Sequence, residues 1–200
     1  MAQEVAVIDS GGANITSLRF ALERLGARSV VTRDANIIRN ASHVVLPGVG
    51  AAADAMARLT ESGLSQVIPT LTQPVLGICL GMQLLAEASE EDRASCLGVV
   101  PGSSGKLDAA PESPVPNMGW CPLERIVQHP LLEGIPVGDW FYFVHSYALP
   151  PGEYTLAEAS HTRRFTAVLA HGNFMATQFH PERSARAGAR VLGNFLAMAA

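Results

Sequence analysis

Four short apolar runs, alternating with helical patterns, dominate the first half of the chain. They cover residues 4–9, 29–32, 43–46 and 75–78. After the first run, apolar residues recur at helical spacing from Ile15 to Leu25, and Gly26 ends the pattern. Alternating strands and helices of this length pack as a parallel sheet with helices on both faces. The sequence therefore predicts an α/β fold with a doubly wound, mostly parallel sheet.

The second half of the chain has a different pattern. Residues 101–116 are rich in Pro, Gly and Ser, which predicts a loop or short irregular strands. Three later runs are typical of β-strands and are separated by turn residues: 140–147, 165–169 and 174–179. We expect them to add antiparallel strands to the parallel core. A helix is predicted over roughly residues 184–198, and no repeat or linker divides the chain, so one domain spanning residues 1–200 is expected.

Composition excludes several classes of function. Apolar residues make up 48% of the chain and charged residues 16%, which indicates a folded protein. The formal net charge is -4 and Lys and Arg form no run, so nucleic-acid binding is not expected. Without a signal peptide or an apolar stretch of about 18 residues, the expected location is the cytoplasm, away from membranes. The three cysteines lack C-x-x-C spacing, so neither a disulfide scaffold nor a metal site is expected.

Cys79 stands where the fourth apolar run meets a helical pattern that covers residues 82–87. Gly77 and Gly81 flank it and lack the side chains that would clash in a tight, exposed elbow. Backbone N–H groups at the start of the following helix favour a thiolate over a thiol. These features predict a cysteine nucleophile. A small, buried core cysteine is the alternative that this stretch alone leaves open.

A nucleophilic cysteine needs a base, and the base needs an orienting partner. The best candidates are His180 and Glu182, which flank Pro181 directly after the apolar run 174–179. The rigid turn that Pro181 imposes lets both side chains project in similar directions. Glu182 would select the tautomer of His180, and His180 would move the proton of Cys79 to the leaving group. Both motifs follow strands, where doubly wound sheets carry their sites.

The turn Pro-Gly-Val-Gly at residues 47–50, here called the oxyanion turn, follows the third strand. Attack on an amide carbon creates an oxyanion, which two backbone N–H groups can stabilise. The glycines allow the backbone to turn an N–H group inward, so Val49 is predicted to supply one donor. Leu80, directly after the nucleophile, is predicted to supply the other. A loop without a catalytic role is the alternative for this turn.

Together these stretches resemble the class I (triad-type) glutamine amidotransferases. Residues 77–83, Gly-Ile-Cys-Leu-Gly-Met-Gln, match the G-x-C-x-G-x-Q elbow of the family, and residues 180–182 match its H-P-E motif. Within the family, the chain is similar to the glutaminase subunits of imidazole glycerol phosphate synthase. That similarity rests on four segments, residues 47–50, 116–120, 141–147 and 176–184. The resemblance covers nearly the whole chain and implies the flavodoxin-like fold of the family.

The resemblance also implies a reaction and the residues that perform it. Cys79, His180 and Glu182 would form a triad that hydrolyses glutamine through a γ-glutamyl thioester, without a cofactor or a metal. The residues that would bind glutamine are Gly50, Gln83, Glu91, Ser146 and Tyr147. A carboxylate at position 91 suits the α-ammonium group of the substrate.

A partner subunit is implied as well. Ammonia would pass through a channel to a cyclase subunit, a (β/α)8 barrel that forms a heterodimer with this chain. The cyclase would make imidazole glycerol phosphate and aminoimidazole carboxamide ribotide in histidine biosynthesis. Met118 and Trp120 would face it.

Some residues depart from the family pattern. The departures are Ser10 for Tyr, Ala13 for Gly, Asn117 for His, Cys121 for Asn and Arg183 for Lys. None touches the triad, and we expect them to affect the subunit interface. The polar turn at residues 10–14 lacks G-x-G-x-x-G and G-K-[ST], so a plain strand-to-helix loop is favoured over a phosphate site.

Three other functions stay open at this point. The chain could be the glutaminase of another pathway, such as anthranilate or pyridoxal phosphate synthesis. The oxyanion turn and the Pro-x-Met-Gly-Trp segment at residues 116–120 weigh against that reading. A catalytically silent binding protein with this fold is the second alternative. The third is a stand-alone cysteine hydrolase of γ-glutamyl peptides.

Overall fold

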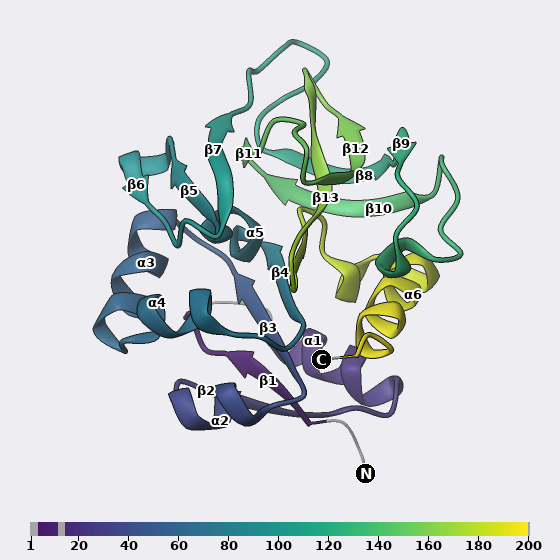
Figure 1. The fold of residues 1–200 in the computed structure, drawn as a ribbon. Coiled ribbons are helices and arrows are strands. Elements are labelled where there is room, and N and C mark those ends of the chain that lie inside the picture. The colour runs from purple at the N-terminus through teal and green to yellow at the C-terminus, as the bar shows by residue number, and fades with distance from the viewer. Residues whose placement is uncertain (1–3, 12–14, 200) are drawn as a thin grey trace.

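An eight-stranded sheet forms the centre of the computed structural model, which describes residues 4–11 and 15–199 (Figure 1). Its strand order is β2-β1-β3-β4-β14-β13-β12-β9. Five neighbouring strands are parallel: β1 (Glu4–Ile8), β2 (Arg28–Thr32), β3 (His43–Gly48), β4 (Val75–Cys79) and β14 (Phe174–Thr177). Three antiparallel strands extend one edge: β13 (Arg164–His171), β12 (Thr155–Ser160) and β9 (Arg125–Ile126). The predicted parallel core with added antiparallel strands is confirmed. Of the three later runs, however, only residues 165–169 lie in an added antiparallel strand, because β14 pairs in parallel with β4 and residues 140–145 belong to a separate two-stranded sheet.

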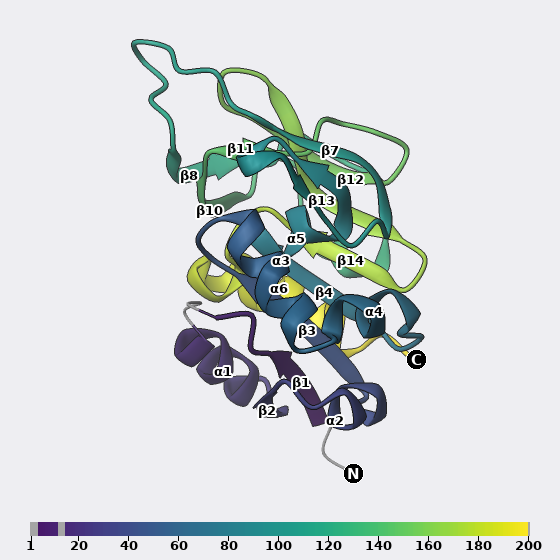
Figure 2. The ribbon, with the colours of Figure 1, turned by 90° about the vertical axis from the view of Figure 1, so that its left-hand side faces the viewer.

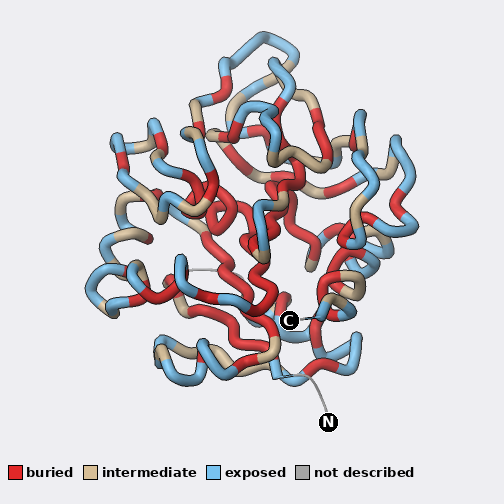
Figure 3. Tube along the Cα trace, viewed as in Figure 1, coloured by how far each residue is buried: buried red, intermediate tan, exposed pale blue. Residues whose placement is uncertain are grey.

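Helices cover both faces of the parallel strands because both faces are apolar. In β1, Val5 and Val7 pack in one cluster with α1 (Ile15–Arg24) and α6 (Ala185–Leu196). The alternate residues Ala6 and Ile8 pack in a second cluster with the helices on the other face. Those helices are α2 (Ala35–Asn40), α3 (Ala52–Glu61) and α4 (Leu64–Val67). Figure 2 shows α3 and α4 in front of β3 and β4, and Figure 3 shows the central strands buried along most of their length.

Two smaller sheets stand beside the parallel strands. One has four strands in the order β11-β7-β5-β6, and the other pairs β8 with β10. Their strands are β5 (Ala86–Ser89), β6 (Ala94–Ser95), β7 (Val100–Lys106), β8 (Asn117–Pro122), β10 (Trp140–His145) and β11 (Tyr147–Ala148). The remaining elements are α5 (Leu80–Leu85) and the short 3-10 turns η1 (Ile68–Thr70), η2 (Glu91–Arg93), η3 (Pro130–Leu132) and η4 (Pro181–Arg183).

The structure corrects two further expectations. The helical pattern was expected to continue to Glu87, but α5 ends at Leu85 and β5 begins at Ala86. Ala86 pairs with Val100 of β7, so a distant strand decides the conformation there. Residues 101–106, expected as loop or short irregular strands, belong to the seven-residue strand β7, which is held by β5 and β11.

The described part of the chain contains no helix that is both long and apolar enough to span a bilayer. The turn expected at residues 10–14 lies partly outside the described residues, as does the departure at position 13. Ser10 and Gly11 are described, and they follow β1 directly.

Candidate active site

Cys79 occupies a strained elbow between β4 and α5. Its backbone angles are φ 55° and ψ −110°, a conformation that residues with a side chain rarely adopt. A Cβ atom at Gly81 would collide with the carbonyl oxygen of Leu46 in β3, and one at Gly77 would lie 2.9 Å from the carbonyl oxygen of Gly81. The two glycines therefore allow the elbow to pack directly against the neighbouring strand, which presents Cys79 at the end of the sheet.

The side chain of Cys79 lies in a polar setting. Its Sγ atom is 3.5 Å from the carbonyl oxygen of Val144 and 3.8 Å from Nε2 of Gln178. Gln178 follows β14. The last pair between β14 and β4 joins Thr177 to Ile78, so the next two residues, Gln178 and Cys79, lie side by side. Gln178 was not among the site residues predicted from the sequence. Its position directly after a strand, two residues before His180, is the signal that could have identified it.

His180 and Glu182 form a buried hydrogen-bonded pair. Nδ1 of His180 lies 2.9 Å from Oε1 of Glu182, and the two side chains are 10% and 4% exposed. The backbone N–H of His180 donates to the carbonyl of Tyr142, and the Ser184 hydroxyl donates to the carbonyl of His180. These bonds hold the main chain of His180 on both sides. Glu182 has a second carboxylate oxygen that is buried and has no hydrogen-bond partner among residues 4–11 and 15–199.

The surroundings of His180 favour its charged form. Burial lowers the pKa of His180, but hydrogen bonds with Cys79 and Glu182, together with the negative charges of both, raise it to about 10. Because Nδ1 of His180 faces Glu182, Nε2 is the ring nitrogen that can exchange a proton with Cys79. An imidazolium next to a cysteine stabilises the thiolate, the form in which a cysteine attacks a carbonyl carbon.

A cavity of about 330 Å³ lies in front of Cys79. Every predicted site residue except Glu182 lines it: Val49, Gly50, Cys79, Leu80, Gln83, Glu91, Ser146, Tyr147 and His180. Four further residues contribute to the lining: Pro116, Val144, His145 and Arg183. The volume is at the small end of the range for ligand sites, which suits a single amino acid.

Gln83 and Glu91, two of the predicted glutamine-binding residues, are held by hydrogen bonds within the protein. The side-chain Nε2 of Gln83 donates to the carbonyl of Tyr147 at 2.8 Å and to Oε1 of Gln178 at 3.2 Å. The Oε2 atom of Glu91 accepts the N–H of Ala52, the first residue of α3, at 2.8 Å. Within residues 4–11 and 15–199, no hydrogen bond engages the amide oxygen of Gln83 or the Oε1 atom of Glu91, so both oxygens can accept hydrogen bonds from a ligand.

One end of the cavity is acidic. Burial raises the pKa of the Tyr147 phenol, and the negative charges of Glu91, Asp92 and Glu90 raise it further. A field that opposes the ionisation of a phenol favours a cation at the same place. This end of the cavity therefore suits an ammonium group.

His145, which contributes to the cavity wall, is buried and neutral. Its Nδ1 donates to the carbonyl of Tyr147 at 2.9 Å, so Nε2 is the acceptor for the side-chain amide of Asn117 at 3.1 Å. Burial lowers the pKa of His145 to about 4. Asn117 also faces Cys121, whose Sγ lies 3.6 Å from Oδ1 of Asn117. These two departures from the family pattern thus belong to a buried contact network.

Protonation of His145 predicts acid sensitivity. A histidine whose pKa is lower in the folded state than in the unfolded state contributes stability above pH 6.5 that is lost as the pH falls toward 4. We expect protonation of His145 to lower the free energy of unfolding by up to about 3 kcal/mol between pH 6.5 and 4. The free energy of unfolding, measured by urea titration between pH 6.5 and 4, should fall less steeply in His145→Gln than in the wild type. The exposed His171→Gln variant should follow the wild type. Equal slopes in all three proteins would contradict the prediction.

Comparison with known proteins identifies the family. The model of the family "Glutamine amidotransferase class-I" matches residues 6–199. This chain belongs to the class I glutamine amidotransferases. The expected family and enzyme class are thereby confirmed.

Relatives of this amidotransferase carry more specific names. This chain is 52% identical over 194 residues to "Imidazole glycerol phosphate synthase subunit HisH 2" of Legionella pneumophila (strain Paris). The match covers 97% of this chain and 98% of the relative. The chain is 45% identical over 202 residues to "Imidazole glycerol phosphate synthase subunit HisH" of Vibrio cholerae, covering 98% and 99%.

Solved structures show the same fold. A crystal structure of a glutamine amidotransferase superposes with a TM-score of 0.75 at 20% identity, covering 96% of both chains. The structure of PurLQS from Thermotoga maritima superposes with a TM-score of 0.67 at 15% identity, covering 98% of both chains. At these identities the likeness concerns the fold of the amidotransferase alone.

Proposed function

We propose that this amidotransferase is the glutaminase subunit of an imidazole glycerol phosphate synthase. The observation that carries the proposal is Cys79 on its strained elbow, beside the His180–Glu182 pair, in a cavity sized for one amino acid. The names of the relatives supply the pathway. The chain would act as one catalytic domain over residues 1–200, since strands from both halves of the sequence pair in the central sheet.

The proposed reaction begins with glutamine in the cavity. Glu91, at the acidic end, binds the α-ammonium group, and four residues hold the rest of the substrate: Gly50, Gln83, Ser146 and Tyr147. Cys79 attacks the side-chain amide carbon, and the N–H groups of Val49 and Leu80 stabilise the oxyanion. His180 then donates its proton to the leaving nitrogen, which departs as ammonia.

The γ-glutamyl thioester that remains on Cys79 is hydrolysed in the second half of the reaction. His180 is neutral after the first half and takes a proton from the attacking water. Glu182 keeps Nε2 of His180 directed at Cys79 through both halves, because it holds Nδ1. Glutamate leaves, and the thiolate–imidazolium pair is restored.

The ribbon of β8 and β10 presents a surface for a partner. The cross-strand pairs Tyr142–Trp120 and Val144–Met118 lie on one face of it. Met118, Trp120 and Trp140 are 65%, 47% and 55% exposed, whereas Phe141 and Phe143 on the other face are fully buried. Large exposed apolar side chains on one face are typical of an interface. We propose that this face docks on a cyclase subunit, a (β/α)8 barrel in the cytoplasm that receives the ammonia.

The guanidinium of Arg183 extends this surface toward the active site. It lies 4.4 Å from the centroid of the Tyr142 ring and also lines the cavity that contains Cys79. The docking face and the active site therefore meet at Arg183 and at Val144, which also lines the cavity. This continuity offers a route by which partner binding can affect glutamine hydrolysis.

Glutamine turnover with and without the cyclase subunit tests the proposal. We expect weak glutaminase activity in the isolated chain and strong stimulation by the cyclase. At limiting cyclase concentration, the Trp120→Ala variant should be stimulated less than the wild type. Val127→Ala, an exposed apolar residue outside the ribbon, is the matched control. Full activity without a partner would favour a stand-alone hydrolase. Stimulation by the anthranilate enzyme instead of the cyclase would assign the chain to another pathway.

A further inference from the structure

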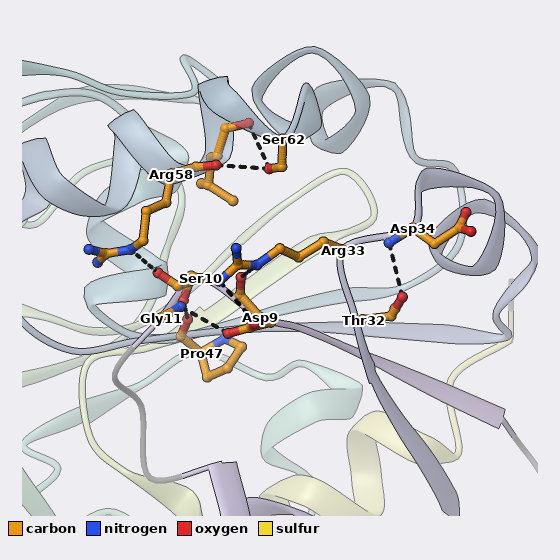
Figure 4. A network of polar contacts seen from close by, with 10 residues as sticks. Asp9, Ser10, Gly11, Thr32, Arg33, Asp34, Pro47, Arg58 and Ser62 are labelled. Atoms are coloured by element: carbon orange, nitrogen blue, oxygen red, sulfur yellow. Dashed lines mark hydrogen bonds and ion pairs between the residues drawn. The ribbon is translucent and has the colours of Figure 1, made fainter.

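The end of strand β3 is supported differently on its two sides. Toward β4, backbone pairing continues as far as Gly48 and Cys79. Toward β1, pairing stops at Val7 and Val45. Beyond that point the hydroxyl of Ser10 takes the place of a backbone partner, and it donates to the carbonyl of Pro47 at 2.6 Å (Figure 4). Pro47 is the first residue of the oxyanion turn.

Ser10 is itself held in place. Its side chain is buried, and its carbonyl accepts a hydrogen bond from Nε of Arg58 in α3 at 2.6 Å. The residue before it, Asp9, is bound by Arg33, whose Nε donates to the Asp9 carbonyl and whose Nη2 lies 3.0 Å from Oδ2. Figure 4 shows both arginines converging on this short loop. The Ser10 hydroxyl is therefore a rigid anchor for the carbonyl of Pro47.

The anchored segment leads directly to the groups that would receive the oxyanion. A Cβ atom at Gly48 would lie 2.9 Å from Cβ of Leu80, so the strand end touches the residue that follows the nucleophile. After Val49, Gly50 has a φ of 91°. The chain is held again at Ala52, whose N–H donates to Glu91. Side chains therefore hold the backbone at Pro47 and again at Ala52. Four residues lie between these two positions, and Val49 is one of them.

We propose that Ser10 is a positioning residue for the oxyanion turn, acting through the carbonyl of Pro47 to hold the N–H of Val49 in place. This inference rests on the proposed function, because it concerns the oxyanion of glutamine hydrolysis. Ser10 is one of the departures from the family pattern, and it acts through its hydrogen bond to Pro47 and not through contact with the reacting atoms. Loss of its hydroxyl slows the chemical step while the cavity that binds glutamine keeps its shape.

The Ser10→Ala variant of the full chain, in complex with the cyclase, tests this role. We expect kcat for glutamine hydrolysis to fall roughly three- to tenfold, the range that one buried hydrogen bond supports, with KM changed less than about twofold. Alkylation of Cys79 by iodoacetamide forms no oxyanion, so its rate should match the wild type. Deuterium uptake by the amides of residues 48–52 should be faster in the variant.

Two further variants sharpen the test. Arg58→Ala removes the bond that holds the Ser10 carbonyl and should lower kcat in the same direction by a smaller factor. Ser62→Ala removes a hydroxyl that donates to carbonyls at the end of the same helix and should behave as the wild type.

Unchanged kcat and deuterium uptake in Ser10→Ala would overturn the proposal. So would a parallel fall in kcat and in Cys79 alkylation, because the whole elbow would then have moved. Failure of the proposed function has a separate signature, a wild-type complex that hydrolyses no glutamine. In that case the deuterium uptake of residues 48–52 alone decides whether Ser10 anchors the turn.

Discussion

Replacing Cys79 with alanine is expected to lower glutamine-dependent turnover of the complex by about 10⁴-fold or more, because no other group can form the thioester. Synthesis from added ammonia should continue at the wild-type rate, since ammonia reaches the cyclase without the triad. The measurement is product formation by the purified complex with glutamine or with an ammonium salt as the nitrogen source.

Cys96→Ala is the matched control for this variant. Cys96 is a half-buried cysteine outside the cavity, and burial raises the pKa of its thiol to about 11, so it is a poor nucleophile. Its replacement should leave both activities intact. A Cys79→Ala complex that still used glutamine would instead support a binding protein whose triad is silent.

Replacing Gly81 with alanine is expected to destabilise the fold. The added Cβ atom would collide with the carbonyl oxygen of Leu46. That carbonyl cannot move away easily, because Leu46 is paired with Gly77 in the central sheet. Overpacking against backbone forces the elbow or the strand to shift, and we expect the free energy of unfolding to fall by about 3 kcal/mol. Glutamine turnover should fall with it, because the elbow carries Cys79.

Gly193→Ala is a glycine control within the same chain. Gly193 lies inside α6, and the nearest heavy atom to an added Cβ would be a side-chain carbon of Leu25 at 3.9 Å. Alanine should therefore stabilise the protein by about 0.5–1 kcal/mol. Urea unfolding of both variants and the wild type measures the difference. Equal stability of Gly81→Ala and wild type would show that the elbow can relax around a side chain.

The candidate site shows why several of its residues could be predicted from sequence motifs alone. In a parallel sheet the carboxyl ends of the strands share one edge, so residues that follow strands meet there. Cys79 follows β4, His180 comes after β14, and the oxyanion turn begins at the end of β3. Since β4 lies between β3 and β14, these motifs had to converge once the strand order was set.

Contacts between distant segments were harder to anticipate. Ala86 could continue a helix or begin a strand, and its pairing with Val100 decided between them. The departure at Asn117 was expected to affect the subunit interface, yet its side chain is buried against His145. In each case the local pattern was compatible with two outcomes. The contacting residue that decides the outcome, Val100 for Ala86 and His145 for Asn117, lies elsewhere in the chain.

The parallel core and the elbow could be predicted from the chain because apolar periodicity and glycine positions constrain the backbone locally, and the motifs at residues 77–83 and 180–182 indicated the family. The polar groups that support the site could be identified only in the folded protein. The hydroxyl of Ser10 acquires its partner Pro47 from a strand 37 residues away, and Glu91 reaches the first turn of α3 across 39 residues. A hydrogen bond depends on the distance between two atoms in space, and the fold alone sets that distance for residues so far apart in the chain.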